Sequence, residues 1–239
     1  MEKSKKLSRR TILSIFIILF LIPLTIWFGI YRLNDRKYYF ISMLIIIYTM
    51  IPFLLVFEDR EPQARELIII AVLSAIAVAG RAAFFMVQQF KPVVAIVIIS
   101  GLAFGPESGF LVGAVSGFAS NFFAGQGPWT PWQMFSFGII GFLAGILYEK
   151  KLLTSKKLPL SIFGGLATFF IYGGIMDLAS LFMFTKEISW PKLLAMYASG
   201  FWFNIIHASA SFIFLYFISQ PMLEKLNRIK VKYGLIKNN

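Results

Sequence analysis

The sequence contains few side chains that could carry out chemistry, and its one histidine, His207, lies within a long apolar run. With no second histidine and no cysteine, the chain lacks the ligand spacing of a metalloprotease or a di-metal site. Ser209 and Ser211 lie close to His207, but residues two and four apart on one helix do not by themselves form a catalytic dyad. We therefore expect no catalytic residue and no metal site. The ordinary role of such a histidine is a hydrogen bond to a neighbouring helix.

Two charged side chains, Arg81 and Asp177, also lie within apolar runs. Charges inside a membrane are costly, so such residues are candidates for function. Arg81 and Asp177 have opposite charges and are expected at similar depth. One interpretation is a structural ion pair, and the other is that they contact polar groups of a ligand.

A segment without any charge, residues 121–134, connects two apolar runs. Pro128 and Pro131 should stiffen it, and its glycines permit a tight turn. Its tryptophans, Trp129 and Trp132, could simply mark a membrane interface. The alternative is a rigid extracytoplasmic loop that acts as a lid, whose flat apolar surface and neutral hydrogen-bonding groups suit a large, mostly uncharged ligand.

The positions of these residues depend on apolar runs that are long enough to cross a bilayer, for which a helix needs about 20 residues. The chain is 58% hydrophobic and 14% charged, which excludes a soluble enzyme of ordinary composition. We predict eight spans, at residues 11–30, 38–57, 67–88, 93–104, 109–124, 133–148, 160–184 and 193–219. The sequence Gly105-Pro106 should break the run from 93 to 124 into two helices, the first of them short.

Lysine and arginine lie mainly between the apolar runs, so the net charge of +12 is explained by membrane topology and requires no nucleic acid. With the N-terminus inside, most of these cations fall in cytoplasmic segments, as the positive-inside rule requires. Both termini are therefore expected in the cytoplasm. The first apolar run is expected to be an uncleaved anchor, because no small-residue cleavage pattern follows it.

The uneven distribution of small residues along the sequence suggests how the chain is divided into parts. Most of the 18 glycines lie between Gly80 and Gly200, and small residues allow helices to pack closely in lipid. We predict a two-helix membrane hairpin with a charged cytoplasmic linker at 1–66, a six-helix membrane core at 67–220 and a basic cytoplasmic tail at 221–239. The fold class is all-α: a polytopic membrane protein whose six-helix core is preceded by two extra transmembrane helices.

Two rows of small residues recur every four positions within this core, and each row lies on one helix face. They are Ala71, Ala75, Ala79 and Ala83, and Gly109, Gly113 and Gly117. Packing inside the core is the ordinary interpretation. The alternative is that the alanine face docks a second protein.

These features together resemble a known family. The six spans, the row Ala71-x-x-x-Ala75-x-x-x-Ala79 and the loop Gly-Gln-Gly-Pro-Trp-Thr-Pro-Trp-Gln-Met at 125–134 resemble the substrate-binding S-component of energy-coupling factor (ECF) vitamin transporters. The loop is similar to that of the cobalamin or corrinoid type. The two spans before residue 67 depart from the six-helix pattern and are expected to be an accessory hairpin.

The resemblance implies a non-enzymatic subunit of the bacterial plasma membrane that captures a vitamin from outside. It would then associate with a transmembrane coupling protein and two cytoplasmic ATPases, and topple to release its cargo. In the family the Ala-x-x-x-Ala face meets the coupling protein, which here falls on Ala71, Ala75 and Ala79. No phosphate-binding loop occurs in this chain, so energy must come from partners. The chain would have no cofactor of its own, and cobalamin or another vitamin would be its ligand.

The expected ligand contacts combine the loop with polar residues of the helices. They are Asn121, Gln126, Trp129, Trp132 and Gln133, and Arg81, Gln88, Asp177, Asn204 and His207. The nearly charge-free outward loops disfavour a multiply charged anion as cargo. Riboflavin or a queuosine-type base is the alternative cargo, and an intramembrane enzyme or a structural scaffold is the alternative outside transport.

Overall fold

The computed structural model describes residues 16–21, 24–25, 38–59, 64–185 and 187–233. These residues form helices, turns and loops, and no strand occurs among them, which confirms the all-α prediction. The chain divides into two compact units, Met1–Pro62 and Gln63–Asn239. The first unit contains the short π-helix η1 (Ile17–Leu21) and the helix α3 (Tyr38–Asp59), which covers the predicted span 38–57. Much of the predicted span 11–30 lies outside the described residues.

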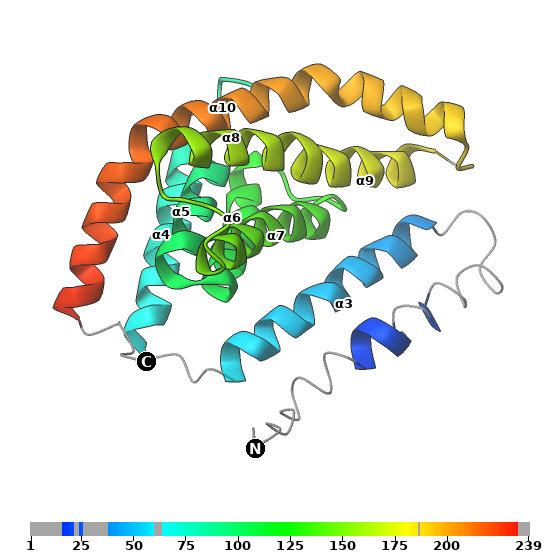
Figure 1. The fold of residues 1–239 in the computed structure, drawn as a ribbon. Coiled ribbons are helices and arrows are strands. Elements are labelled where there is room, and N and C mark those ends of the chain that lie inside the picture. Colours follow the sequence, from blue (N-terminus) through cyan, green and yellow to red (C-terminus); the bar gives the residue numbers. More distant parts are fainter. Residues whose placement is uncertain (1–15, 22–23, 26–37, 60–63, 186, 234–239) are drawn as a thin grey trace. The chain divides into compact units, whose positions relative to one another are not determined.

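The second unit is a bundle of helices (Figure 1). Its elements are α4 (Ala64–Ala83), α5 (Val93–Phe104), α6 (Pro106–Ala124), α7 (Thr130–Glu149), α8 (Lys157–Ala167), η3 (Thr168–Gly173), α9 (Gly174–Phe184) and α10 (Trp190–Lys232). The elements α8, η3 and α9 follow one another without interruption, and α10 runs alongside them (Figure 1). Of the helices described, four are long and apolar enough to cross a membrane: α4, α7, the run Lys157–Phe184 and α10. The prediction of a polytopic membrane protein is confirmed, whereas the eight predicted spans differ from these helices in number and bounds.

The predicted break after residue 104 is confirmed. Gly105 separates α5 from α6 with a φ of 92°, a conformation that favours glycine, and Pro106 begins the next helix, where its missing N–H is not needed. The helix α5 has only 12 residues, Val93–Phe104, which are the bounds of the short span predicted at 93–104. Its residues are apolar on every face and buried from Val93 to Ala103, because the other helices surround it. It is the centre of the second unit.

The two rows of small residues have different surroundings. A Cβ atom at Gly109 would lie 2.6 Å from the carbonyl oxygen of Gly141, and one at Gly113 would lie 2.5 Å from the carbonyl carbon of Phe137. The glycine row is therefore what allows α6 to pack directly on the backbone of α7. The side chains of Ala71, Ala75 and Ala79 are instead exposed on α4, so the alanine row does not pack inside this unit.

The helix α10 is longer than the predicted span 193–219, since it runs from Trp190 to Lys232 and contains Pro221. Beyond the apolar run the helix is held by polar contacts. Gln220 donates to the carbonyl of Ser155, and Lys230 Nζ donates to the carbonyl of Ala103 at 2.5 Å. The last turns of α10 bend away from its first part (Figure 1). Residues 221–232 of the predicted tail are thus helical, and the three-part division of the chain stays a prediction.

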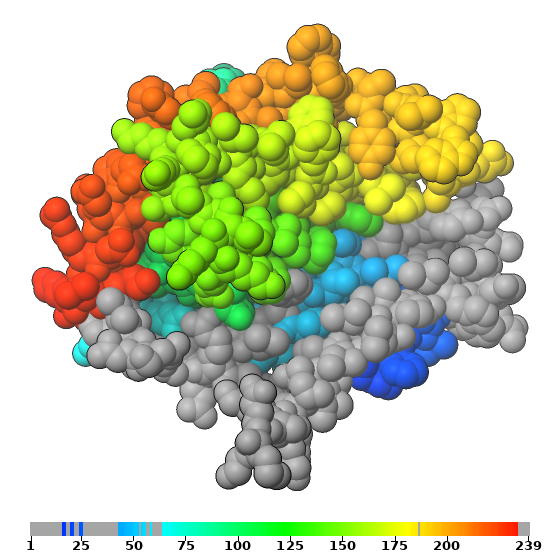
Figure 2. Space-filling view, viewed as in Figure 1, coloured from blue at the N-terminus to red at the C-terminus, as the bar shows by residue number. Residues whose placement is uncertain are grey.

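The helices α8, α9 and α10 form a continuous face of the second unit (Figure 2). Together with η3, which joins α8 to α9, they expose large apolar side chains, among them Leu166, Phe170, Trp202 and Phe217. Exposed apolar surface of this extent is typical of a face that contacts lipid or another protein. This face agrees with a membrane location.

Candidate functional site

A cavity of about 590 Å³ lies where α4 ends and α5 begins. Its wall is built from residues of α4 and the turn that follows it, of α5, α6, α7, η3 and α10. Four of the predicted site residues line it: Arg81, Gln88, Gln133 and His207. The cavity is therefore the candidate ligand site.

Arg81 is the centre of a polar network at this cavity. Its Nη1 donates to Ser120 Oγ at 2.5 Å, to Asn121 Oδ1 at 2.9 Å and to Gln133 Oε1 at 3.3 Å. The three acceptors are neutral, and each directs the negative end of a dipole at the guanidinium. The network joins α4 to α6 and α7 and fixes the position of the charge.

Asp177 is not the partner of Arg81. Asp177 Oδ2 accepts a hydrogen bond from Asn204 Nδ2 at 2.8 Å, between α9 and α10. A Cβ atom at Gly173 would lie 2.6 Å from the side chain of Asn204. Glycine at this position of η3 therefore leaves the space that the Asn204 side chain occupies when it contacts Asp177. The ion pair between Arg81 and Asp177 that the sequence left open is wrong, and Asp177 and Asn204 do not line the cavity.

A second polar chain starts from Gln133 on the cavity wall. Gln133 Nε2 donates to the hydroxyl of Tyr172 at 2.8 Å. The ring of Tyr172 stacks on Phe137 with centroids 4.7 Å apart and meets the ring of His207 edge-on at 4.6 Å. Tyr172 lies in the π-helix η3, an element that often occurs at functional sites.

His207 is only 3% exposed, and its Nδ1 has no hydrogen-bond partner among the described residues. The helix-to-helix hydrogen bond expected of a lone membrane histidine is therefore not formed through Nδ1. Because His207 lines the cavity, a ligand could supply the partner that this nitrogen lacks.

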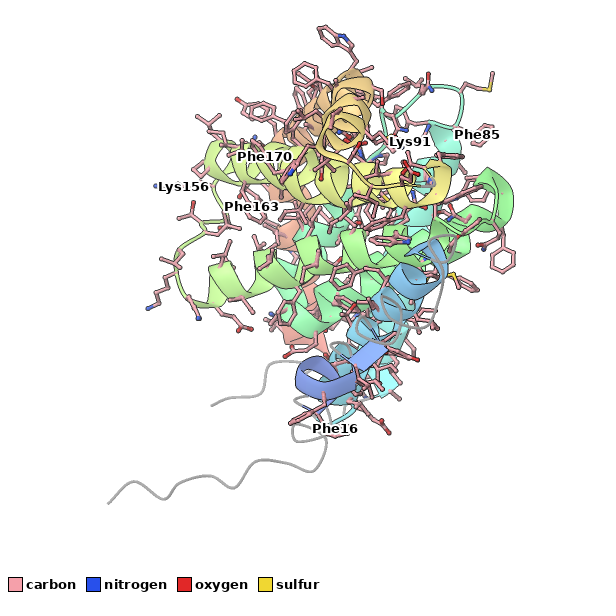
Figure 3. The ribbon with its side chains drawn as sticks, turned by 90° about the vertical axis from the view of Figure 1, so that its right-hand side faces the viewer. Phe16, Phe85, Lys91, Lys156, Phe163 and Phe170 are labelled. Atoms are coloured by element: carbon pink, nitrogen blue, oxygen red, sulfur yellow. The ribbon has the colours of Figure 1, made fainter. Side chains whose placement is uncertain are left out.

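Lys91 lies in the turn between α4 and α5, beside Phe85 (Figure 3). Its Nζ donates to the carbonyls of Phe84 at 2.5 Å, Phe85 at 3.2 Å and Val87 at 2.6 Å. Lys91 therefore holds the turn that follows α4, which ends at Ala83 and not at residue 88. Partial burial and the nearby positive charge of Arg81 both lower the pKa of the Lys91 ammonium. The cavity wall therefore carries two cations.

The neutral segment 121–134 is mostly helical, which corrects the prediction of one long loop. Asn121 lies in the last turn of α6, and Trp132 and Gln133 lie in the first turn of α7. Of this segment, only residues 125–129 lie outside the helices. Pro131 does not prevent the formation of α7, because it falls in the first turn of this helix, where proline is tolerated.

The tryptophans of this segment are placed differently. Trp132 is 5% exposed and packs against Phe182 with ring centroids 5.9 Å apart, whereas Trp129 is 36% exposed. Trp132 thus belongs to the interior of the bundle. Gln126 and Trp129 remain as the exposed part of the predicted lid, next to the cavity-lining Ala124.

Thr130 fixes the short loop. Its Oγ1 donates to Gln126 Oε1 at 3.0 Å and accepts from Asn121 Nδ2 at 3.1 Å. Gln126 Nε2 also donates to the carbonyl of Phe118 at 3.0 Å. Asn121 therefore holds both Arg81 and the loop, and it acts on the site by positioning, since it does not line the cavity itself.

Tyr172, Phe137 and Lys91 are the important cavity residues that the sequence reasoning missed. Lys91 carried a signal, since it is a lone cation between two apolar runs. Tyr172 carried none, because it is one of many aromatic residues in its span and only the fold brings it to Gln133.

Residues 65–219 of the chain match the protein family described as "ECF transporter, substrate-specific component". A UPF0397 protein of Vibrio atlanticus is 30% identical over 125 residues, which cover 49% of this chain and 68% of that protein. A UPF0397 protein of Aliivibrio salmonicida is 30% identical over 106 residues, 42% of this chain and 56% of its own length. The chain thus spans little more than half of the second relative. No solved structure matches the chain.

The matched residues contain the whole cavity wall and the alanine row. They also contain the six predicted spans and the loop at 125–134 from which the resemblance was drawn, so the match confirms that resemblance at the level of the family. The chain belongs to the family of ECF transporter substrate-specific components.

Proposed function

We propose that this chain captures a vitamin or a vitamin precursor in the cavity around Arg81 and hands it to an ECF module for import. Membership of the family makes it a substrate-specific transport subunit. The observation that carries the proposal is the cavity itself, whose volume of about 590 Å³ lies in the range of small-molecule sites. Its wall combines aromatic side chains with a few fixed polar groups, which is the usual composition of such sites.

The cavity is proposed to open on the extracytoplasmic side, with both termini in the cytoplasm of a bacterial cell. Lys230 donates to the carbonyl of Ala103, at the end of α5 that is away from the cavity. Arg65, at the start of α4, donates to the carbonyl of Tyr233, three residues after Lys230. Lys156 lies on the opposite side of the unit from Lys91 (Figure 3). The concentration of cations away from the cavity supports this orientation through the positive-inside rule.

The exposed alanine row is proposed to dock the transmembrane coupling protein, which in turn acts with two cytoplasmic ATPases. Ala71, Ala75 and Ala79 are exposed along one face of α4, together with Ile68 and Val72. Small side chains allow another helix to approach closely in lipid, where the hydrophobic effect gives no driving force. ATP hydrolysis by these partners would supply the energy for transport, because this chain has no phosphate-binding loop of its own.

Cobalamin or another corrinoid is the cargo that the loop motif supports. Such a macrocycle would extend from the cavity over the exposed side chains of Gln126 and Trp129. Riboflavin or a queuosine-type base is the second candidate, and the specific observation in its favour is the cavity volume, which suits a ligand of that size without use of the loop.

The proposal is tested by purification of the full chain from cells supplied with corrinoids, riboflavin and other vitamins. Bound molecules are identified by mass spectrometry, and a corrinoid is also recognised by its visible absorption. We expect one vitamin or precursor to co-purify and to bind saturably when added back. The absence of both a co-purifying molecule and saturable binding would overturn the proposal.

A further inference from the structure

The charges of the cavity wall all have one sign. Arg81 and Lys91 line the cavity, and no aspartate or glutamate occurs among its lining residues. Asp177, an acid on α9, is hydrogen-bonded to Asn204 and does not line the wall. The cavity therefore has positive charge without an acid of its own to balance it.

Arg81 is held but not neutralised. Its three hydrogen bonds all leave from Nη1 and go to the neutral oxygens of Ser120, Asn121 and Gln133. Within the described part of the chain, Nε and Nη2 have no such acceptor. A guanidinium in a membrane helix without a counter-ion is costly, and its free edge has the geometry that binds a carboxylate or a phosphate through two parallel hydrogen bonds.

Two further groups converge on the same space. His207 is buried on the cavity wall with an Nδ1 atom that has no partner among the described residues. Lys91 approaches from the turn after α4, where the positive charge of Arg81 contributes to lowering its pKa, so the two cations repel each other. An anion between them would remove this repulsion and would satisfy Nε and Nη2 of Arg81, which the protein leaves open. The three N–H groups of Lys91 already donate to the carbonyls of Phe84, Phe85 and Val87, so Lys91 would act on the anion through its charge.

We propose that the cargo presents one anionic oxygen group, a carboxylate or a phosphate, to Arg81 and Lys91. The inference rests on the proposed function, because it names the chemical class of the ligand in the same cavity. Gln133, Tyr172 and His207 then contact the neutral remainder of the ligand. A single anionic group on an otherwise neutral molecule refines the expectation of a mostly uncharged ligand that the charge-free segment suggested.

The test uses pairs of molecules that differ in the anionic group. Cobinamide phosphate is paired with cobinamide, and flavin mononucleotide with riboflavin, for the phosphate. Biotin is paired with biotinamide, and pantothenate with pantothenol, for the carboxylate. Equilibrium binding of each molecule is measured on the purified full chain in detergent.

Variants separate the ligand contact from a merely structural role. Arg81→Gln and Lys91→Gln each remove one cavity charge, and Arg81→Lys keeps the charge but removes the forked geometry. Arg65→Gln is the matched control, because it removes the same charge from the other end of α4, where Arg65 contacts the backbone of Tyr233. Elution as a single species and the thermal unfolding of each ligand-free variant show whether it is folded.

We expect at least one acid to bind more tightly than its neutral partner by about tenfold or more, the effect of one hydrogen bond to a charged group. Arg81→Gln and Lys91→Gln should remove that preference, Arg81→Lys should retain part of it, and Arg65→Gln should not change it. If Arg81→Gln does not fold, Lys91→Gln carries the comparison alone.

Equal binding of both members of every pair that binds, or an acid preference that survives in Lys91→Gln and in folded Arg81→Gln, would overturn this inference and leave the proposed function intact. Saturable binding by none of the eight molecules, together with no molecule that co-purifies with the chain, would overturn both. If a different molecule co-purifies, a carboxylate or phosphate on it supports this inference, and a molecule without either group overturns the inference and leaves the proposed function intact. Preference within the cobinamide and flavin pairs identifies a phosphate, and preference within the biotin and pantothenate pairs identifies a carboxylate.

Discussion

Arg81 on α4 and Asn121 on α6 are 40 positions apart in the sequence and are joined by a hydrogen bond of 2.9 Å from Nη1 to Oδ1. Asn121 is 1% exposed and also donates to Thr130, which fixes the loop before α7. One amide thus links the charge in the cavity to the segment that carries the exposed Gln126 and Trp129. The position of the charge and the conformation of the loop depend on the same side chain.

Replacement of Asn121 by Ala should therefore weaken both features. We expect a loss of about 1–3 kcal/mol in the free energy of unfolding, since buried groups lose their hydrogen-bond partners, and weaker ligand binding. Thermal unfolding of the purified protein and equilibrium binding measure the two effects. Ser199→Ala, at an exposed position of α10, is the control and should change neither. An unchanged unfolding temperature in Asn121→Ala would contradict this role.

The contact between α6 and α7 gives a prediction about stability alone. At Gly113 an added Cβ would lie 2.5 Å from the carbonyl carbon of Phe137, whereas at Gly174 it would meet no atom within 4 Å. Gly113→Ala should destabilise the protein by about 1–3 kcal/mol because α6 must move away from α7. Gly174→Ala should be neutral or slightly stabilising, because alanine favours helix. Thermal unfolding of the two variants compares them directly, and equal effects would contradict the described packing.

The alanine face of α4 gives a prediction about transport without an effect on binding. Ala75→Trp should prevent close approach of the coupling protein and abolish uptake, while ligand binding by the isolated chain stays at the wild-type level. Leu166→Trp on α8 is the control, because it enlarges another exposed apolar position, and it should retain uptake. Uptake by cells that also contain the ECF module is the measurement. Normal uptake by Ala75→Trp would show that this face does not dock the coupling protein.

The sequence was sufficient to predict those features that depend on local chemistry. Gly105 and Pro106 marked the break between α5 and α6, because a left-handed glycine followed by a proline ends one helix and begins the next. Arg81 was singled out because a charge in an apolar run is costly, and the structure places it on the cavity wall.

Features that depend on contacts distant in sequence were not predictable in the same way. An ion pair of Arg81 with Asp177 was one of the two interpretations that their charges allowed, but neutral side chains of α6 and α7 accept the hydrogen bonds of the guanidinium. Tyr172 lines the cavity and accepts a hydrogen bond from Gln133, 39 positions away, and no local pattern in the sequence marked it. The end of α10 lies beyond the apolar run because Lys230 is held by the carbonyl of Ala103, a contact that hydropathy does not reveal.

The central claim is that the chain holds its cargo in the cavity around Arg81, and a cavity-filling substitution tests it most directly. Ala124 lines the cavity, whereas Ala198 is exposed on α10. Equilibrium binding of the molecule that co-purifies with the wild-type protein is measured for Ala124→Trp and Ala198→Trp. We expect Ala124→Trp to lose affinity by about tenfold or more, as the loss of good contacts in a pocket would produce, and Ala198→Trp to bind as the wild type does. Wild-type affinity in a folded Ala124→Trp protein would show that the ligand binds elsewhere.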